Sequence, residues 1–190
     1  LYADESRQTP ALTWHGLRQQ TEKQAGKPSR CLADFVAPRM DAQGKSTQLK
    51  DYAGVFAVTA GIGVEKREQA FEAAHDDYSA IMLKALADRF AEAFAECLHE
   101  RVRKDLWGYA AAESATLEDL VAEKYQGIRP APGYPACPDL EDNARVAELL
   151  EAGRIGIEVG EETGWQYQPE QSTSAIICHH PKSKYFVARD

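Results

Sequence analysis

The 190-residue sequence has no run of eighteen apolar residues, so we expect no membrane-spanning helix. It also has no excess of positive charge, because 22 lysines and arginines stand against 30 aspartates and glutamates. Nucleic-acid phosphates attract basic surfaces, so the net charge of −8 argues against a nucleic-acid partner. The first ten residues match neither a signal peptide nor a transit peptide. These absences together predict a cytoplasmic protein that does not enter membranes.

Cysteine is also scarce, and its spacing is wide. The four cysteines are Cys31, Cys97, Cys137 and Cys178, with no C-x-x-C pair among them. Structural metal sites usually use closely spaced pairs, so we expect free buried thiols in a reducing compartment and no metal site. The tripeptide Cys178-His179-His180 does not change this expectation, because neighbouring residues on a strand point to opposite faces.

The length and the 44% hydrophobic content suit one domain, residues 1–190, with its own core. The first residue is not methionine, and we interpret the chain as a fragment of a longer protein. Periodicity and turn residues predict helices at 14–26, 71–107, 116–125 and 141–152. Strands are predicted at 30–37, 52–61, 154–160, 173–180 and 184–188. Helices inserted irregularly between strands indicate an α+β fold.

The predicted helix 71–107 is the dominant element. Its bulky apolar residues recur every three or four positions from Tyr78 to Leu106, which predicts one stripe packed across a sheet. Asp76 or Asp77 suits its start, and Gly108 suits its end. Four acidic residues lie four positions apart on another face of this helix: Asp88, Glu92, Glu96 and Glu100. They form either a solvated surface or a carboxylate surface that receives a cation or a basic partner.

The segment 127–138, GIRPAPGYPACP, contains four of the nine prolines. Proline fixes φ and removes a hydrogen-bond donor, so this segment is a stiff loop rather than a helix or a central strand. Pro132 and Gly133 suit the corners of a type II turn. The loop is either a rigid connector or a preformed binding wall, and the presence of Arg129 and Tyr134 favours the wall.

Two long motifs make the chain recognisable: HDDYSAIMLKALADRFAEAFAECLHERVRKDLWGY and YQGIRPAPGYPACPD. With LRQQTEK, CLADFVAP, DYAGVFAVTAG and SKYFVA in the same order, they resemble the C-terminal activation domain of cobalamin-dependent methionine synthase. The resemblance extends over nearly the whole chain from about His15. It implies a C-shaped α+β domain with a long central helix and a twisted, mainly antiparallel sheet.

The resemblance also implies a function. The family's enzyme transfers a methyl group from methyltetrahydrofolate to homocysteine through cobalamin, which a neighbouring domain holds. Its activation domain binds S-adenosylmethionine and supports reductive methylation of cobalamin that has become oxidised. Flavodoxin or a flavoprotein reductase supplies the electron. The chain alone is not expected to turn over homocysteine, and we assign it no catalytic residue.

The family pattern places the S-adenosylmethionine site in the proline-rich loop and the last aromatic pair. The corresponding residues here are Arg129, Ala131, Gly133, Tyr134, Tyr185 and Phe186. A guanidinium suits the ligand's carboxylate, and an aromatic face suits its sulfonium. Asp88 and Glu92 occupy the family's acidic positions, where they would contact the ligand or a partner.

Several departures from the family pattern bear on affinity. The family's first ligand-binding carboxylate lies before Leu1, and the family's terminal helix lies beyond Asp190, so we expect truncation at both ends. Leu140 stands where the family usually has histidine, and Ala175 where it commonly has glycine. These differences leave an alternative open: a degenerate or stand-alone relative that docks a partner without binding the ligand tightly.

Overall fold

The computed structural model describes residues 1–188, and its centre is an antiparallel pair of strands. β1 (Gly54–Thr59) pairs with β2 (Ser172–Ile177), so that Gly54 lies opposite Ile177 and Thr59 lies opposite Ser172. Both strands contain small and β-branched residues that suit a half-buried pleated surface. The α+β class, the antiparallel pairing and the strands expected at 52–61 and 173–180 are therefore confirmed.

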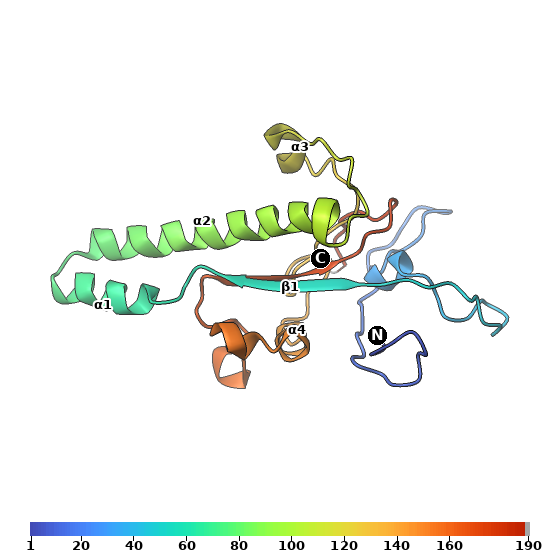
Figure 1. Ribbon diagram of the computed structural model, residues 1–190, viewed down its shortest axis with the longest axis horizontal. Helices are drawn as coiled ribbons and strands as arrows, with labels where there is room; N and C mark the ends of the chain where they lie inside the picture. Colours follow the sequence, from blue (N-terminus) through green and yellow to red (C-terminus); the bar gives the residue numbers. More distant parts are fainter. Residues whose placement is uncertain (189–190) are drawn as a thin grey trace.

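Helices lie on both sides of this strand pair (Figure 1). α2 (Asp77–Arg101) runs along one face, where Phe56 and Val58 of β1 pack against it. α4 (Asp142–Leu150) lies on the opposite side, towards which Ala57 points. Side chains alternate along a strand, so consecutive residues of β1 serve two separate clusters. α1 (Val64–Ala73) packs along α2 beyond the end of the strands.

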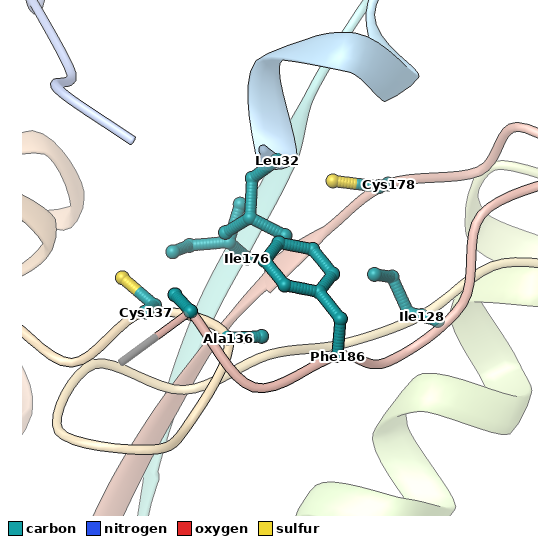
Figure 2. Close-up of a cluster of buried hydrophobic side chains, with 8 residues drawn as sticks. Leu32, Ile128, Ala136, Cys137, Ile176, Cys178 and Phe186 are labelled. Carbon is teal, nitrogen blue, oxygen red and sulfur yellow. The ribbon is translucent and has the colours of Figure 1, made fainter. Parts of the chain in front are cut away.

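A third cluster attaches loops to the face opposite α2. Figure 2 shows the ring of Phe186 beside Leu32, with Ile176 of β2 and Ile128 of the proline-rich loop on either side. Ala136 and Cys137 complete the contact from the far end of the same loop. The proline-rich loop and the C-terminal segment are thus fixed to the sheet by buried apolar contacts.

The long helix differs from the prediction at its start. Residues 64–73 form the separate helix α1, and the chain turns at His75, whose φ is 59°. Asp76 then caps α2, because its carboxylate accepts a hydrogen bond from the Ser79 amide at 3.1 Å. After Arg101 the helix continues as the π-helical turn η2 (Val102–Leu106), and Gly108 follows with φ 75°. The expected cap and the terminal glycine are confirmed, whereas the start at 71 is wrong.

The buried face of α2 is made of small residues instead of the bulky stripe. Ala80, Ala87, Ala91 and Ala95 are buried, and Ala95 has no exposed surface. Leu98 and Val102 of the expected stripe are partly buried and pack against the strand cluster. The other bulky residues that we expected in the core are exposed: Tyr78, Ile81, Met82, Leu86, Phe90, Phe94 and Leu106. Alanines let the helix axis approach the strands and α1 closely, which is the reason that this expectation fails.

The N-terminal segment lacks the helix predicted at 14–26 and the strand predicted at 30–37. Its only helical element among residues 1–53 is the 3₁₀ helix η1 (Leu32–Phe35). The amide of Gln19 instead donates to the Arg30 carbonyl at 2.8 Å, and the amide of Gln20 donates to the Ala188 carbonyl at 3.0 Å. These long-range backbone bonds hold the segment extended, so tertiary pairing overrides the local helical pattern.

The C-terminal half also corrects several boundaries. The predicted strand 154–160 is replaced by the 3₁₀ helices η3 (Ala152–Ile155) and η4 (Glu161–Thr163) with one bridge between Glu158 and Gln168. Segment 184–188 is not a strand, because one edge of β2 pairs with β1 and the other bonds the proline-rich loop at Pro130. The helix at 116–125 shortens to α3 (Leu117–Val121), whose expected capping box from Thr116 to Asp119 is present. The helix at 141–152 is confirmed as α4.

Three of the four free cysteines are buried, but Cys97 is exposed, contrary to expectation. Within residues 1–188, no cluster of three or more histidine, cysteine or acidic side chains is placed to hold a metal ion. In the same range, no helix combines the length and the apolar character that crossing a membrane requires.

Candidate ligand-binding cleft

A cavity of about 710 Å3 opens between α2, the proline-rich loop and the C-terminal segment. Leu120 and Val121 of α3 also line it. α3 lies on the side of α2 away from β1 (Figure 1). The expected site residues Arg129, Ala131, Tyr134, Tyr185 and Phe186 all line the cavity. Side chains far apart in the sequence therefore meet in one cleft, because the sheet and the core cluster beneath it hold both loop segments.

The loop wall is preformed by backbone bonds. The Tyr134 amide donates to the Ala131 carbonyl at 3.3 Å, and Gly133 has φ 85° at the third corner, as a type II turn requires. The Ile176 amide of β2 donates to the Pro130 carbonyl at 2.9 Å, which joins the loop to the outer edge of the strand. The turn predicted at Pro132-Gly133 is confirmed, and the loop does not depend on a ligand for its shape.

Arg129 is anchored at both its backbone and its guanidinium. Its amide donates to the Tyr185 hydroxyl at 3.0 Å, and its terminal Nη2 donates to Glu96 Oε2 at 2.9 Å. The two side chains are 25% and 28% exposed, so this ion pair is largely shielded from water. Burial alone lowers the pKa of Arg129, but the hydrogen bond and attraction from Glu96 more than offset it and raise the pKa overall. The guanidinium therefore carries a permanent positive charge into the cleft.

The two aromatic residues Tyr185 and Phe186 lie in different surroundings, one in the cleft and the other in the core. Tyr185 faces the cleft, and its hydroxyl accepts the hydrogen bond from the Arg129 amide. Burial raises the pKa of Tyr185, so its hydroxyl stays protonated at neutral pH. Phe186 borders the cleft, but its ring is 8% exposed and packs in the core cluster of Figure 2. It supports the cleft wall from behind.

The remaining expected site residues, Asp88, Glu92 and Gly133, differ in whether they line this cavity. Glu92 borders the main cavity and a neighbouring one of about 580 Å3, whereas Asp88 borders the neighbouring one. Tyr134 is exposed and stands between the two cavities. Gly133 lies behind the wall, where an added Cβ would meet Leu140 Cδ2 at 2.7 Å. Gly133 thus shapes the wall through its turn.

Sequence reasoning missed several residues of the cleft. Glu96, Tyr125 and three residues at and after α3, Leu120, Val121 and Glu123, complete its lining. Glu96 belongs to the acidic series, and its four-residue spacing from Glu92 places both on the cleft side of α2. Position in the series could have indicated Glu96, but nothing in the pattern of α3 pointed to the cleft.

A buried charged group lies directly behind the cleft. Arg103 in η2 has no exposed surface, and it donates two hydrogen bonds of 2.8 Å to the two carboxylate oxygens of Glu113. A third bond of 2.8 Å joins its Nη1 to His99 Nδ1, and its guanidinium lies 4.2 Å from the centre of the Tyr125 ring. Burial first, and then Arg103 and Arg129, lower the pKa of His99 to about 3. His99 is therefore neutral, and its Nδ1 accepts the bond from Arg103.

Comparison with known proteins agrees with this geometry. The family model for the vitamin B12 dependent methionine synthase activation domain matches residues 1–190. The chain belongs to this activation-domain family.

A solved structure of the family has the same fold. It is a crystal structure of the MetH reactivation domain bound to AdoHcy, with 51% sequence identity and a TM-score of 0.89. The match covers 99% of this chain and 55% of that chain, so this chain spans about half the length of that structure. The resemblance first indicated by the proline-rich loop and the long helix is confirmed.

Proposed function

We propose that this chain is a module that binds S-adenosylmethionine and supports reductive methylation of the cobalamin of methionine synthase. The observation that carries the proposal is the cleft in which Arg129, Tyr134 and Tyr185 face one cavity bordered by Glu92 and Glu96. S-adenosylmethionine offers a carboxylate, an ammonium, a sulfonium and an adenosine, and this set of side chains complements each charge. The related domain bound to AdoHcy supports the proposal, since AdoHcy is the demethylated form of the same ligand.

Each of these residues has its own role in binding the ligand. Arg129 holds the ligand carboxylate with the donors that Glu96 leaves unused, because a guanidinium offers five in a fixed plane. The Ala131 backbone borders the ligand within the fixed turn that Gly133 permits. Tyr134 and Tyr185 offer aromatic faces to the sulfonium, and Phe186 supports Tyr185 from the core. Asp88 and Glu92 contact the ligand or the partner from α2.

The proposed cycle needs two partners. Cobalamin is held by a neighbouring domain of methionine synthase, and the bound S-adenosylmethionine supplies the methyl group that restores it. Flavodoxin or a flavoprotein reductase supplies the electron. We place the reaction in the cytoplasm, where a reducing environment suits the three buried free thiols. The methyltransferase activity belongs to the whole enzyme, and we expect the isolated chain to form no methionine from homocysteine.

A second candidate is a docking module that binds the ligand weakly or not at all. The exposed apolar face of α2, with Phe90 65% exposed and Tyr78 75% exposed, favours it. Docking proteins often carry such apolar faces. The two candidates differ in one measurable property, which is affinity for S-adenosylmethionine.

Titration calorimetry of the chain with S-adenosylmethionine tests the proposal. We expect saturable binding by the wild type and a loss of about 10- to 150-fold in Arg129→Ala, because a charge-assisted hydrogen bond contributes about 1.5–3 kcal/mol. Arg129→Lys restores only part of the loss, since an ammonium cannot reproduce the planar fork. Arg101→Ala, which removes an exposed arginine at the end of α2, is the matched control. Equal affinity of Arg129→Ala and the wild type would show that the loop is only a connector.

A further inference from the structure

Glu96 lines the cleft next to the buried Arg103, and its contacts indicate more than a structural role. Glu96 lies between two guanidiniums: its Oε2 accepts from Arg129 at 2.9 Å, and its Oε1 lies 4.0 Å from Arg103 Nη1. Oε1 is buried and makes no hydrogen bond with residues 1–188. A buried carboxylate oxygen without a hydrogen bond is stabilised by a nearby positive charge, and the Arg103 guanidinium is such a charge.

Arg103 is the fixed member of this group. Glu113 binds it with two parallel bonds, His99 accepts a third, and the Tyr125 ring lies against its guanidinium. A fully buried guanidinium with these partners has no room to move. Its charge therefore attracts the Glu96 carboxylate from a fixed position.

Arg129, by contrast, is held at a single point of its guanidinium. Among residues 1–188, Glu96 is the hydrogen-bond partner that the structure gives this side chain, and the Nε of Arg129 is buried without one. An arginine side chain has several rotatable bonds, and ordering them costs conformational entropy. Because Glu96 fixes the side chain before a ligand arrives, this entropy is already lost in the free protein.

We propose that Glu96 is a positioning residue, which Arg103 anchors and which holds the Arg129 guanidinium with its remaining donors directed to the ligand carboxylate. The proposal rests on the proposed function, in which Arg129 binds that carboxylate. Glu96 acts through Arg129 in this arrangement. It determines how well the cleft distinguishes a ligand with an amino-acid moiety from one without it.

Comparing the affinities for two ligands distinguishes a positioning role of Glu96 from general damage to the cleft. S-adenosylmethionine carries the carboxylate, whereas 5′-methylthioadenosine keeps the adenosine and the sulfur but lacks the amino-acid moiety. We expect Glu96→Ala to weaken S-adenosylmethionine by about tenfold, the equivalent of one weakened charge-assisted bond. Affinity for 5′-methylthioadenosine stays within about twofold, the usual scatter between independent sites.

A double-mutant cycle tests the route through Arg129. In the Arg129→Ala background, we expect Glu96→Ala to change affinity for S-adenosylmethionine by less than about twofold, since the residue that it positions is gone. Glu96→Gln keeps one acceptor for Arg129, so it recovers part of the affinity and also serves if the alanine variant does not fold. Glu100→Ala is the matched control, because Glu100 lies one turn further along α2 in a separate ion pair with Lys104. Thermal unfolding of every variant verifies the fold.

Five results would overturn the inference. Equal losses for both ligands would show a structural role, and a loss that persists in the Arg129→Ala background would show direct ligand contact by Glu96. Tighter binding by Glu96→Ala would show that Glu96 competes with the ligand for Arg129. Absence of S-adenosylmethionine binding by the wild type would defeat the proposed function and this inference together, whereas wild-type binding unchanged in Glu96→Ala defeats the inference alone.

Discussion

The two halves of α2 bury different kinds of side chain. Ala80 and Ala87 are the buried residues of the first half, and α1 packs along α2 there. The second half crosses the strands, where it buries Ala91 and Ala95 and also His99, and it continues into η2, where Arg103 is buried. Small side chains need only close approach, but buried polar groups need partners in fixed directions. The first half is therefore specified by volume, and the second half is specified by volume at its alanines and also by hydrogen bonds and charge at His99 and Arg103.

The largest expected effect comes from removing the charge at the centre of the second half. Arg103→Ala leaves Glu113, with a side chain only 10% exposed, without its bidentate partner. Breaking a buried pair in this way costs about 3–5 kcal/mol in the free energy of unfolding. Chemical denaturation measures the loss, and the exposed Arg101→Ala is expected to stay within about 0.5 kcal/mol. Similar stability of the two variants would remove the distinction between the halves.

A volume change tests the small-residue face where α2 meets the strands. Ala95→Leu adds three carbons at a position with no exposed surface, against Phe56 and Ala175. Overpacking of this kind costs about 1–3 kcal/mol. Ala93→Leu, on the exposed side of the same turn, provides the control in thermal unfolding. Tolerance of leucine at 95 would mean that the alanines do not set the helix position.

The pH dependence of stability distinguishes the buried histidine from ordinary ones. Burial and the two arginines lower the pKa of His99 to about 3 in the folded state, against 6.5 for an unperturbed histidine. Below pH 6.5 the unfolded chain binds a proton that the folded chain does not, so stability falls as pH decreases from 6.5 towards 3. The slope from this group approaches about 1.4 kcal/mol per pH unit.

The measurement is denaturation of the wild type and of His99→Gln between pH 7 and pH 5. Glutamine keeps an acceptor for Arg103 but does not titrate, so its stability curve is expected to be flatter by that slope. Parallel curves for the two proteins would mean that His99 is protonated in the folded state.

The smallest effect is expected on the exposed apolar face. Phe90→Ser replaces a ring that is 65% exposed, and we expect a change within about 0.5 kcal/mol in unfolding free energy. Leu86→Ser, at 51% exposure, is expected to behave in the same way. A loss of unfolding free energy above about 2 kcal/mol is the size expected of a core residue, and it would show that the bulky stripe belongs to the core of the domain.

The sequence predicted local features well where one residue type dictates geometry. The Pro132-Gly133 turn, the Asp76 cap and the Thr116–Asp119 capping box are all confirmed. Each depends on backbone constraints within four residues, which a sequence shows directly. The β1 strand was also predictable, because a short β-branched run between glycines is typical of a buried strand.

The errors share a different cause, which is tertiary context. Periodicity predicted the long helix, but it assigned the core to the bulky stripe, whereas the buried residues of α2 are mainly alanines. The segment 14–26 was predicted as a helix from its composition, yet Gln19 and Gln20 take distant backbone partners. The site residues named from the family pattern converge in one region, but Glu96 and Tyr125 emerged only when the loop and α2 were placed together. The roles of these residues in ligand binding stay predictions.

The π-helical turn at the end of α2 sets a limit on how the chain can change in length. The Trp107 amide donates to the Val102 carbonyl, five positions back, instead of the four of an α-helix. This extra residue lets Arg103 turn inward while the Trp107 ring still lies against β1, where an added Cβ on Gly54 would meet it at 3.0 Å. A deletion of one residue here would restore a regular helix and rotate one of the two side chains out of place. We therefore expect insertions and deletions among descendants of this sequence to collect in the loops around it and to spare residues 102–106.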